Sequence, residues 1–192
     1  MSTQSKTFLT PEEYLEIERK AEFKSEYYQG EMFAVAGATT EHIQIVANAM
    51  RELGNLLADG PCQPLSNDMR VCVTPVGLYT YPHVVIVCGQ LKYLEGAFNT
   101  LVNPTVIIEV LSDSTEAYDR DKKFESYGTL ESLKEYVMIS SRRVRVERYT
   151  REPDGTWNYA ERTGLEDTIH LRSIDCKVPL AGLYKRVEFA PS

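Results

Sequence analysis

The sequence predicts an α/β protein in which a mixed central β-sheet is flanked by helices. Two observations carry this prediction. An apolar stripe with helical spacing runs through residues 41–58, and residues 104–111 are apolar enough to form a central strand buried on both faces. Segments typical of strands precede and follow these two elements, with further helical segments among them.

The first helix is predicted over about residues 11–22 by its start signal. Thr10 supplies a hydroxyl cap, Pro11 stands where its missing N–H costs nothing, and Glu13 can bond back to the cap. These residues serve backbone groups that a helix start leaves without partners, so the helix should begin at Pro11.

A hairpin and a long amphipathic helix follow. Residues 27–35 should form two short strands joined at Gly30, and residues 36–40 a loop. Between residues 41 and 58 apolar side chains recur at intervals of three and four, which predicts a helix with one buried stripe. The stripe is expected to contain Ile43, Val46, Ala47, Met50, Leu53 and Leu57.

The centre of the chain carries three predicted strands and a second helix. The strands cover residues 68–73, 81–87 and 104–111. A helix over residues 116–127 should follow, with residues 112–115 as candidate caps and Gly128 at its end.

The last third of the chain is predicted to be mostly strand. Strands are expected at 135–140, 144–151, 156–162 and 169–171, with a helical turn at 180–184. The turn at residues 153–155, Pro-Asp-Gly, suits a tight bend and predicts an additional carboxyl-terminal antiparallel hairpin. Because no repeat or linker interrupts the chain, residues 1–192 should form a single domain.

Composition limits the functions that the chain can perform. Its 21 basic and 28 acidic side chains give a net charge of −7, which argues against a broad electrostatic clamp on nucleic acid. Any such activity would need a local basic surface. The amino terminus lacks the pattern of a targeting signal, and no apolar run reaches the length of a membrane span. We therefore expect a soluble, cytoplasmic protein.

The four cysteines are predicted to be buried free thiols. Cys62, Cys72, Cys88 and Cys176 are too widely spaced for a CxxC metal or redox motif. Each stands among apolar or strand-like residues, which favours unpaired thiols in a reducing cytosol.

The most informative residue is Glu109, inside the apolar strand at 104–111. A carboxylate is costly to bury unless it is hydrogen-bonded, protonated or bound to a cation. One interpretation places Glu109 at an exposed strand end, bonded to backbone N–H groups of residues 112–115. The other makes it functional, because sites in α/β folds collect at strand ends. The sequence leaves both open.

Asp119 and Lys123 lie one turn apart on the helix that follows Glu109. Taken alone, such a pair is typical of a solvated helical surface. The strand-to-helix connection could instead return Lys123 over Glu109. There a lysine can orient a metal-bound water and stabilise negative charge that develops on a phosphoryl group.

His83 and Asp68 are two further candidates. Strand alternation places His83 on the face opposite Val84, but a lone histidine in a strand is more often structural than a ligand. Asp68 is equally ambiguous, because Arg70 is close enough in sequence to pair with it.

These residues resemble a known family. The run PTVIIEVLSDSTEAYDRDKKFESY at 104–127 is similar to the signature of the Uma-two family, a restriction endonuclease branch of the PD-(D/E)xK nuclease superfamily. The likeness extends to residues 30–34, 41–42, 68–71, 81–85 and 135–137. It implies a restriction-endonuclease-like core and covers most of the chain.

The resemblance also implies a metal site. In this family an aspartate and a glutamate on neighbouring strands hold Mg²⁺ or Mn²⁺, and a lysine lies on the following helix. By position, Glu109 matches the metal-binding glutamate, and Lys123 matches the lysine of a D-x-x-x-K pattern that starts at Asp119. Three more residues match helical positions lining the site or an acidic position: Glu41, His42 and Asp68.

One residue departs from the family pattern. The family reads Pro-Asp-Val where this chain reads Pro82-His83-Val84, so His83 replaces the principal metal-binding aspartate. Mg²⁺ prefers oxygen ligands, whereas Mn²⁺ tolerates imidazole. We therefore expect Mn²⁺ in preference to Mg²⁺, with His83, Glu109 and Asp68 as ligands, and a compromised or altered activity.

Three functional hypotheses follow. The first is a metal-dependent DNA endonuclease, in which Lys123 positions the attacking water. The second is an inactive nuclease-fold module that binds nucleic acid through residues 119–151, where nine basic and six acidic side chains leave a local charge of +3. Arginines that protect an edge hairpin from aggregation would explain that window equally well.

The third hypothesis is a protein-interaction or assembly role. Tyr149, Trp157 and Tyr159 could pack across a partner, although core packing explains them equally well. The family resemblance also leads us to expect a homodimer.

Overall fold

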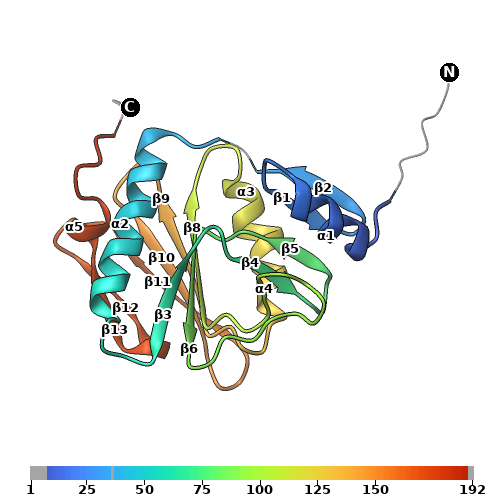
Figure 1. Ribbon diagram of the computed structural model, residues 1–192. Helices are drawn as coiled ribbons and strands as arrows, with labels where there is room; N and C mark the ends of the chain where they lie inside the picture. Colours follow the sequence, from blue (N-terminus) through green and yellow to red (C-terminus); the bar gives the residue numbers. More distant parts are fainter. Residues whose placement is uncertain (1–7, 36, 190–192) are drawn as a thin grey trace.

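Two main β-sheets form the molecule (Figure 1). The structure is a computed structural model that describes residues 8–35 and 37–189. The larger sheet has the strand order β11 (Trp157–Arg162), β10 (Val146–Arg151), β9 (Glu135–Ser140), β8 (Val106–Leu111), β6 (Val84–Cys88) and β3 (Cys62–Ser66). The smaller has the order β2 (Glu31–Ala34), β1 (Ser25–Tyr28), β5 (Leu78–Thr80), β4 (Arg70–Val73) and β7 (Thr100–Leu101).

Both main sheets are mixed. In the larger one β8 runs parallel to β9 and antiparallel to β6, and in the smaller one β4 runs parallel to β7 and antiparallel to β5. A separate antiparallel hairpin near the carboxyl terminus pairs β12 (Thr168–Leu171) with β13 (Cys176–Pro179). The mixed sheets confirm the predicted α/β class. The predicted carboxyl-terminal hairpin around the turn at residues 153–155 is the antiparallel pair of β10 and β11.

The central strand β8 divides the interior into two cores. Val106, Ile108 and Val110 pack on one side with α2 (Thr40–Leu56). Ile107 and Leu111 pack on the other side with the short helix α4 (Phe124–Gly128) and with the smaller sheet. Figure 1 shows α2 on one face of the larger sheet and α4 on the other. Strand alternation places the side chain of Glu109 on the α4 side.

The amino-terminal elements begin as predicted. Helix α1 (Pro11–Lys20) has a complete capping box, because Glu13 N–H donates to Thr10 Oγ1 and Thr10 N–H donates to Glu13 Oε2. Strands β1 and β2 form the predicted hairpin, and Gly30 at its turn has φ of +89°, which glycine adopts without steric cost. Ala36, at the start of the predicted loop, lies outside the described residues.

The buried face of α2 is rotated from the predicted stripe. Ile45 and Ala49 are buried, whereas Ile43 is 57% exposed. The difference arises because two polar side chains of α2 are also buried. His42 Nε2 bonds to the carbonyl of Val110, and Asn48 donates two hydrogen bonds to backbone carbonyls near α5 (Leu180–Leu183). Apolar periodicity alone cannot reveal such partners.

The predicted helix at residues 116–127 has a break in its middle. Helix α3 (Glu116–Tyr118) passes into a π-helical turn over Asp119–Lys123 before α4 begins. The interpretation of Asp119 and Lys123 as a solvated surface pair is excluded, because both are buried. Isolated π-helical turns inside helices are frequent at functional sites.

Four short strands were not predicted: β3, β5, β7 and β13. They have between two and five residues, and β3 and β13 contain Pro64 and Pro179. Proline is tolerated at sheet edges but weakens a strand signal in the sequence. In the described part of the chain, none of the helices has both the length and the apolar character to cross a membrane.

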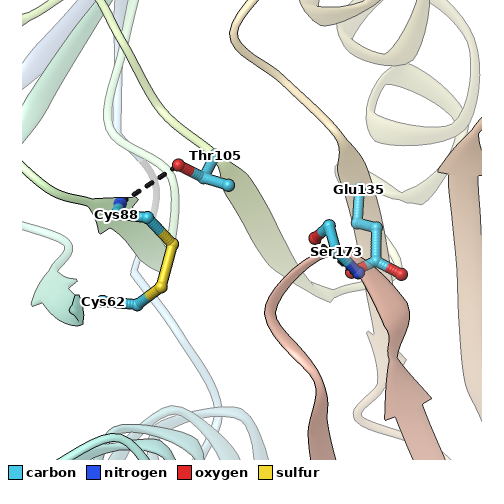
Figure 2. The surroundings of a disulfide bond; sticks show 5 residues. All are labelled: Cys62, Cys88, Thr105, Glu135 and Ser173. Carbon is cyan, nitrogen blue, oxygen red and sulfur yellow. Dashed lines mark hydrogen bonds between the residues drawn. A yellow bond between two sulfur atoms is a disulfide. The ribbon is translucent and has the colours of Figure 1, made fainter. Parts of the chain in front are cut away.

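A disulfide joins β3 to β6 (Figure 2). Cys62 and Cys88 are directly opposite in the antiparallel register, and the N–H of Cys88 also donates to Thr105 Oγ1 at 3.1 Å. The prediction of four free thiols was therefore wrong for this pair. It holds for Cys72 and Cys176, which are buried and unpaired. The pair escapes sequence reasoning because strand β3, which brings Cys62 to Cys88, has a weak strand signal.

Reduction of Cys62–Cys88 is expected to lower the free energy of unfolding by roughly 3 kcal/mol, because the bond closes a loop with a sequence separation of 26. Urea unfolding with and without dithiothreitol measures the change. A Cys62→Ser/Cys88→Ser variant is the control and should not respond to the reductant. Equal stability of the oxidised and reduced natural chain would contradict this expectation.

Candidate active site

Glu109 is completely buried and is surrounded by hydrogen-bond donors. Lys123 Nζ and the Tyr127 hydroxyl both donate to Oε1 at 3.1 Å. His83 approaches Oε2 through Nδ1 at 2.5 Å and through its backbone N–H at 3.3 Å. This geometry excludes the interpretation of Glu109 as an exposed strand end bonded to residues 112–115.

Lys123 bridges three carboxylates. Its Nζ lies 3.0 Å from Glu26, 3.1 Å from Glu109 and 3.4 Å from Asp119. Burial alone would lower the pKa of Lys123, but the three carboxylates outweigh burial and hold the pKa well above its ordinary value. Lys123 is therefore an ammonium ion at neutral pH. It can stabilise negative charge but cannot act as a general base.

Glu109 on β8 and Asp119 on the π-helical turn, which both contact Lys123, have opposite pKa shifts. Burial raises the pKa of Glu109, but Lys123 and His83 outweigh it and lower the pKa to about 2. Burial and the charge of Glu109 raise the pKa of Asp119 to about 6. Within the described residues neither oxygen of Asp119 receives a hydrogen bond. Its Oδ1 instead faces Lys123 Nζ at 3.4 Å.

His83 and His42 lie edge to face, with ring centroids 4.5 Å apart. His42 Nε2 is 3.0 Å from the carbonyl of Val110, so this nitrogen carries the proton. Burial, and secondarily His83, lower the pKa of His42 to about 4. Its imidazole is therefore neutral at physiological pH. Its Nδ1 is buried and has no hydrogen-bond partner in the described part of the chain.

The pKa of His42 gives the stability a specific pH dependence. Its pKa falls from an unfolded value near 6.5 to about 4, so the unfolded chain binds more protons between these values. The stability that His42 contributes is complete above about pH 6.5 and decreases as the pH falls toward 4. Between pH 7.5 and 5, we expect the free energy of unfolding of the natural chain to fall by about 1 to 2 kcal/mol more than that of His42→Gln, as measured by urea unfolding. A difference that does not change with pH would contradict this assignment.

A pocket of about 150 Å³ opens in front of the cluster. His83, Asp119 and Lys123 line its polar wall, and Phe33 and Val35 lie on its apolar wall. Glu109 does not line the pocket, whereas the His83 side chain is 21% exposed. His83 therefore lies between the buried carboxylate and any ligand in the pocket.

Two residues implied by the family resemblance lie outside this cluster. The carboxylate of Asp68 is 80% exposed and pairs with Lys24 at 2.6 Å. The proposed pairing of Asp68 with Arg70 is also absent from the described residues, because Arg70 bonds to other groups. Glu41 lines a neighbouring pocket, and its pKa is lowered by hydrogen bonds at the start of α2, including one from Thr39. Asp68 and Glu41 are therefore not brought to Glu109.

Two residues of the cluster were missed by sequence reasoning. Glu26 comes from β1 in the smaller sheet and reaches Lys123 across the interior. Tyr127 lies four residues after Lys123, so helical spacing could have indicated it. Nothing in the local sequence distinguishes Glu26 from the other glutamates of the amino-terminal region, because its role depends on how the two sheets meet.

The basic window at residues 119–151 offers few free charges. Most of its basic side chains bond to acidic side chains or backbone carbonyls. Among the described residues, Lys122 and Arg143 remain without a hydrogen bond or ion pair in that window. The structure therefore favours internal pairing over an extended phosphate-binding surface.

The aromatic residues of the carboxyl-terminal strands mostly serve the core. Tyr149 and Trp157 both pack on Phe124, with ring centroids 4.5 Å and 5.3 Å away. Tyr159 is 46% exposed and donates to Glu161 at 2.9 Å. Core packing thus accounts for Tyr149 and Trp157.

A mixed sheet between helices, with a buried glutamate on its central strand and a lysine from the following helix, defines a restriction-endonuclease-like protein. A crystal structure from Anabaena variabilis supports this fold. It is titled a "putative nuclease belonging to DUF820", and it superposes with a TM-score of 0.76 at 14% identity, covering 94% of this chain and 99% of that one. The chain belongs to the Uma2 family, described as "Putative restriction endonuclease", whose sequence model matches residues 11–180.

Two Synechocystis proteins are similar in sequence. One, named uncharacterized protein sll1609, is 35% identical over 156 residues, which cover 81% of this chain and 88% of that protein. The other, uncharacterized protein slr1290, is 32% identical over 184 residues and covers 94% of both chains. The family match confirms the predicted family.

Proposed function

We propose that this chain is a divalent-metal-dependent endonuclease that hydrolyses phosphodiester bonds in DNA. The observation that carries the proposal is the buried contact between Glu109 and Lys123 directly behind a pocket that Lys123, His83 and Asp119 line. A structural ion pair would not need a pocket beside it. Family membership supports the same class of reaction.

The donor set at Glu109 is compatible with a divalent cation. Glu109 Oε2 and His83 Nδ1 are neighbours, and Asp119 has oxygens that accept no hydrogen bond from the described residues. The described part of the chain contains no group of three His, Cys, Asp or Glu side chains arranged to hold a metal.

Glu109 and His83 would hold the ion, and the imidazole favours Mn²⁺ over Mg²⁺. A bound ion supplies Lewis acidity at the phosphoryl oxygens and lowers the pKa of a bound water. Lys123 lines the pocket as a permanent cation, so it can orient the attacking water and offset charge that develops on the phosphoryl group. Glu26 and Asp119 fix the position of its ammonium group.

A second candidate function is an inactive nuclease-fold module that binds nucleic acid. The observation that favours it is the position of His83. Both oxygens of Glu109 already accept hydrogen bonds, and His83 separates Glu109 from the pocket. A metal can reach Glu109 only if His83 moves or becomes a ligand itself. Salt-sensitive DNA binding without cleavage would support this alternative.

Cleavage of supercoiled plasmid and of single-stranded DNA tests the proposal. The natural chain and Glu109→Gln are incubated with Mn²⁺, Mg²⁺ or chelator, and nicked and linear products are measured. We expect metal-dependent cleavage by the natural chain, faster with Mn²⁺, and at least 100-fold less with Glu109→Gln. If the natural chain cuts neither substrate while His83→Asp does, the natural chain is not an endonuclease.

We also propose that the chain is a homodimer, as the family resemblance implies. Light scattering should then give twice the 21.8 kDa mass of one chain. A cytoplasmic location remains a prediction. The Cys62–Cys88 bond counts against it, because disulfides are rare in reducing compartments.

A further inference from the structure

Arg70 is a buried cation without a counter-charge of its own. It is 8% exposed, and no carboxylate among the described residues forms an ion pair with it. Its guanidinium bonds only to neutral oxygens: Thr100 Oγ1 from Nε and Nη2, the Phe98 carbonyl from Nη2, and the Tyr81 hydroxyl from Nη1. These bonds use four of its five N–H groups, and its central carbon also lies 5.8 Å from the Tyr14 ring and 5.9 Å from the Tyr81 ring. Burying a charge is costly unless it is paired.

This guanidinium lines a second pocket, of about 270 Å³. Tyr81 lines this pocket and also the pocket in front of Lys123, so the two pockets are neighbours on either side of one side chain. Because each is open, a ligand that extends past Tyr81 could occupy both.

The acidic side chains of the second pocket already have partners. Glu18 accepts hydrogen bonds from Ser25 and, at 2.8 Å, from the Tyr81 hydroxyl. Glu18 is thus linked to Arg70 only through that hydroxyl. Asp68 pairs with Lys24. Burial raises the pKa of Tyr81 to about 12, so its hydroxyl stays neutral beside Arg70.

We propose that Arg70 forms a second phosphate subsite, which binds a phosphodiester of the DNA strand next to the one at Lys123. The inference rests on the proposed function and extends it, because it assigns a further binding residue to the same substrate. Arginine suits this role, since its fork of donors matches phosphate oxygens. Contacts to flanking phosphates fix the register of a strand in a nuclease without reading its sequence.

A purely structural role is the competing explanation. Arg70 and Thr100 are register partners in the parallel pair of β4 and β7, so the side-chain bonds between them could simply hold the edge of the smaller sheet. That role would affect stability but would not make DNA binding depend on one particular phosphate.

A methylphosphonate scan separates the two roles. Oligonucleotides that each carry one neutral linkage at a successive position are bound to the protein, and affinity is measured by fluorescence anisotropy with Ca²⁺ in place of Mn²⁺. For the natural chain we expect two linkages at which neutralisation weakens binding about tenfold. In Arg70→Gln, neutralising one of these two linkages should no longer weaken binding, whereas neutralising the other should weaken it as in the natural chain.

Lys20→Gln is the matched control, because it removes one positive charge at an exposed position that pairs with Glu16. It should leave the scan unchanged. Thermal unfolding shows whether each variant is folded. If Arg70→Gln does not fold, Arg70→Lys replaces it, and the effect at the same single position should shrink while the other stays.

The same scan profile for the natural chain and the folded Arg70 variant would overturn the subsite. The plasmid assay keeps this outcome distinct from failure of the proposed function. If the natural chain cleaves the plasmid but the scan does not depend on Arg70, only the phosphate subsite is rejected. No cleavage, combined with an Arg70-dependent scan, rejects the endonuclease and leaves the phosphate subsite standing.

Discussion

Lys123→Met is expected to reduce Mn²⁺-dependent DNA cleavage at least 100-fold and to lower the free energy of unfolding by about 3 to 5 kcal/mol. The loss of activity follows because Lys123 is the cation that lines the pocket beside Glu109. The loss of stability follows because Glu26, Glu109 and Asp119 would share a buried site without a counter-charge. Plasmid nicking rates and urea unfolding measure the two effects.

Lys122→Met is the matched control for this prediction. Lys122 precedes Lys123 in the chain but is exposed, so its loss should change the unfolding free energy by less than about 0.5 kcal/mol. To separate catalysis from folding, cleavage is measured at a temperature where Lys123→Met is fully folded. Natural cleavage rates in the folded variant would remove Lys123 from the proposed site.

His83→Asp is expected to make Mg²⁺ an effective cofactor, with Mg²⁺-dependent cleavage at least tenfold faster than in the natural chain. Two physical changes act together. A carboxylate replaces the imidazole, which suits an ion that prefers oxygen ligands. The shorter side chain also removes the contact that His83 makes with Glu109 Oε2 and opens Glu109 to the pocket.

His83→Asn distinguishes these two changes. It has the size of aspartate but no charge, so it should open the pocket without creating an anionic ligand, and its Mg²⁺-dependent rate should stay below that of His83→Asp. If His83→Asp gains no activity with Mg²⁺, the position does not hold the metal in this chain.

The sequence predicted those parts of the fold whose signals are local. The capping box at Thr10 and Glu13 and the apolar run around Glu109 correspond directly to α1 and to the central strand β8. The parts that it missed depend on tertiary contacts. Strand β3 has a weak signal and becomes a strand by pairing with β6, and that pairing is what brings Cys62 to Cys88.

The candidate site was predictable to a similar extent. Glu109, His83 and Lys123 were selected from the sequence, and the structure brings them together. The burial of Lys123 was not predictable, because a charged helix segment is usually solvated and because one of its partners, Glu26, comes from the other sheet. Asp68 was expected at the metal site but lies outside it, because its partner is also distant in the sequence. Its partner Lys24 is 44 residues away in the chain.

Mn²⁺ binding followed by electron paramagnetic resonance is the most direct test of the metal site at Glu109 and His83. We predict that the natural chain binds Mn²⁺ with a nitrogen coupling from imidazole in the spin-echo spectrum. His83→Asp should bind the ion without that coupling, and Glu109→Gln should bind it at least tenfold more weakly. A natural chain that leaves Mn²⁺ free in solution, or a nitrogen coupling that persists in His83→Asp, would contradict the assignment of His83 and Glu109 as its ligands.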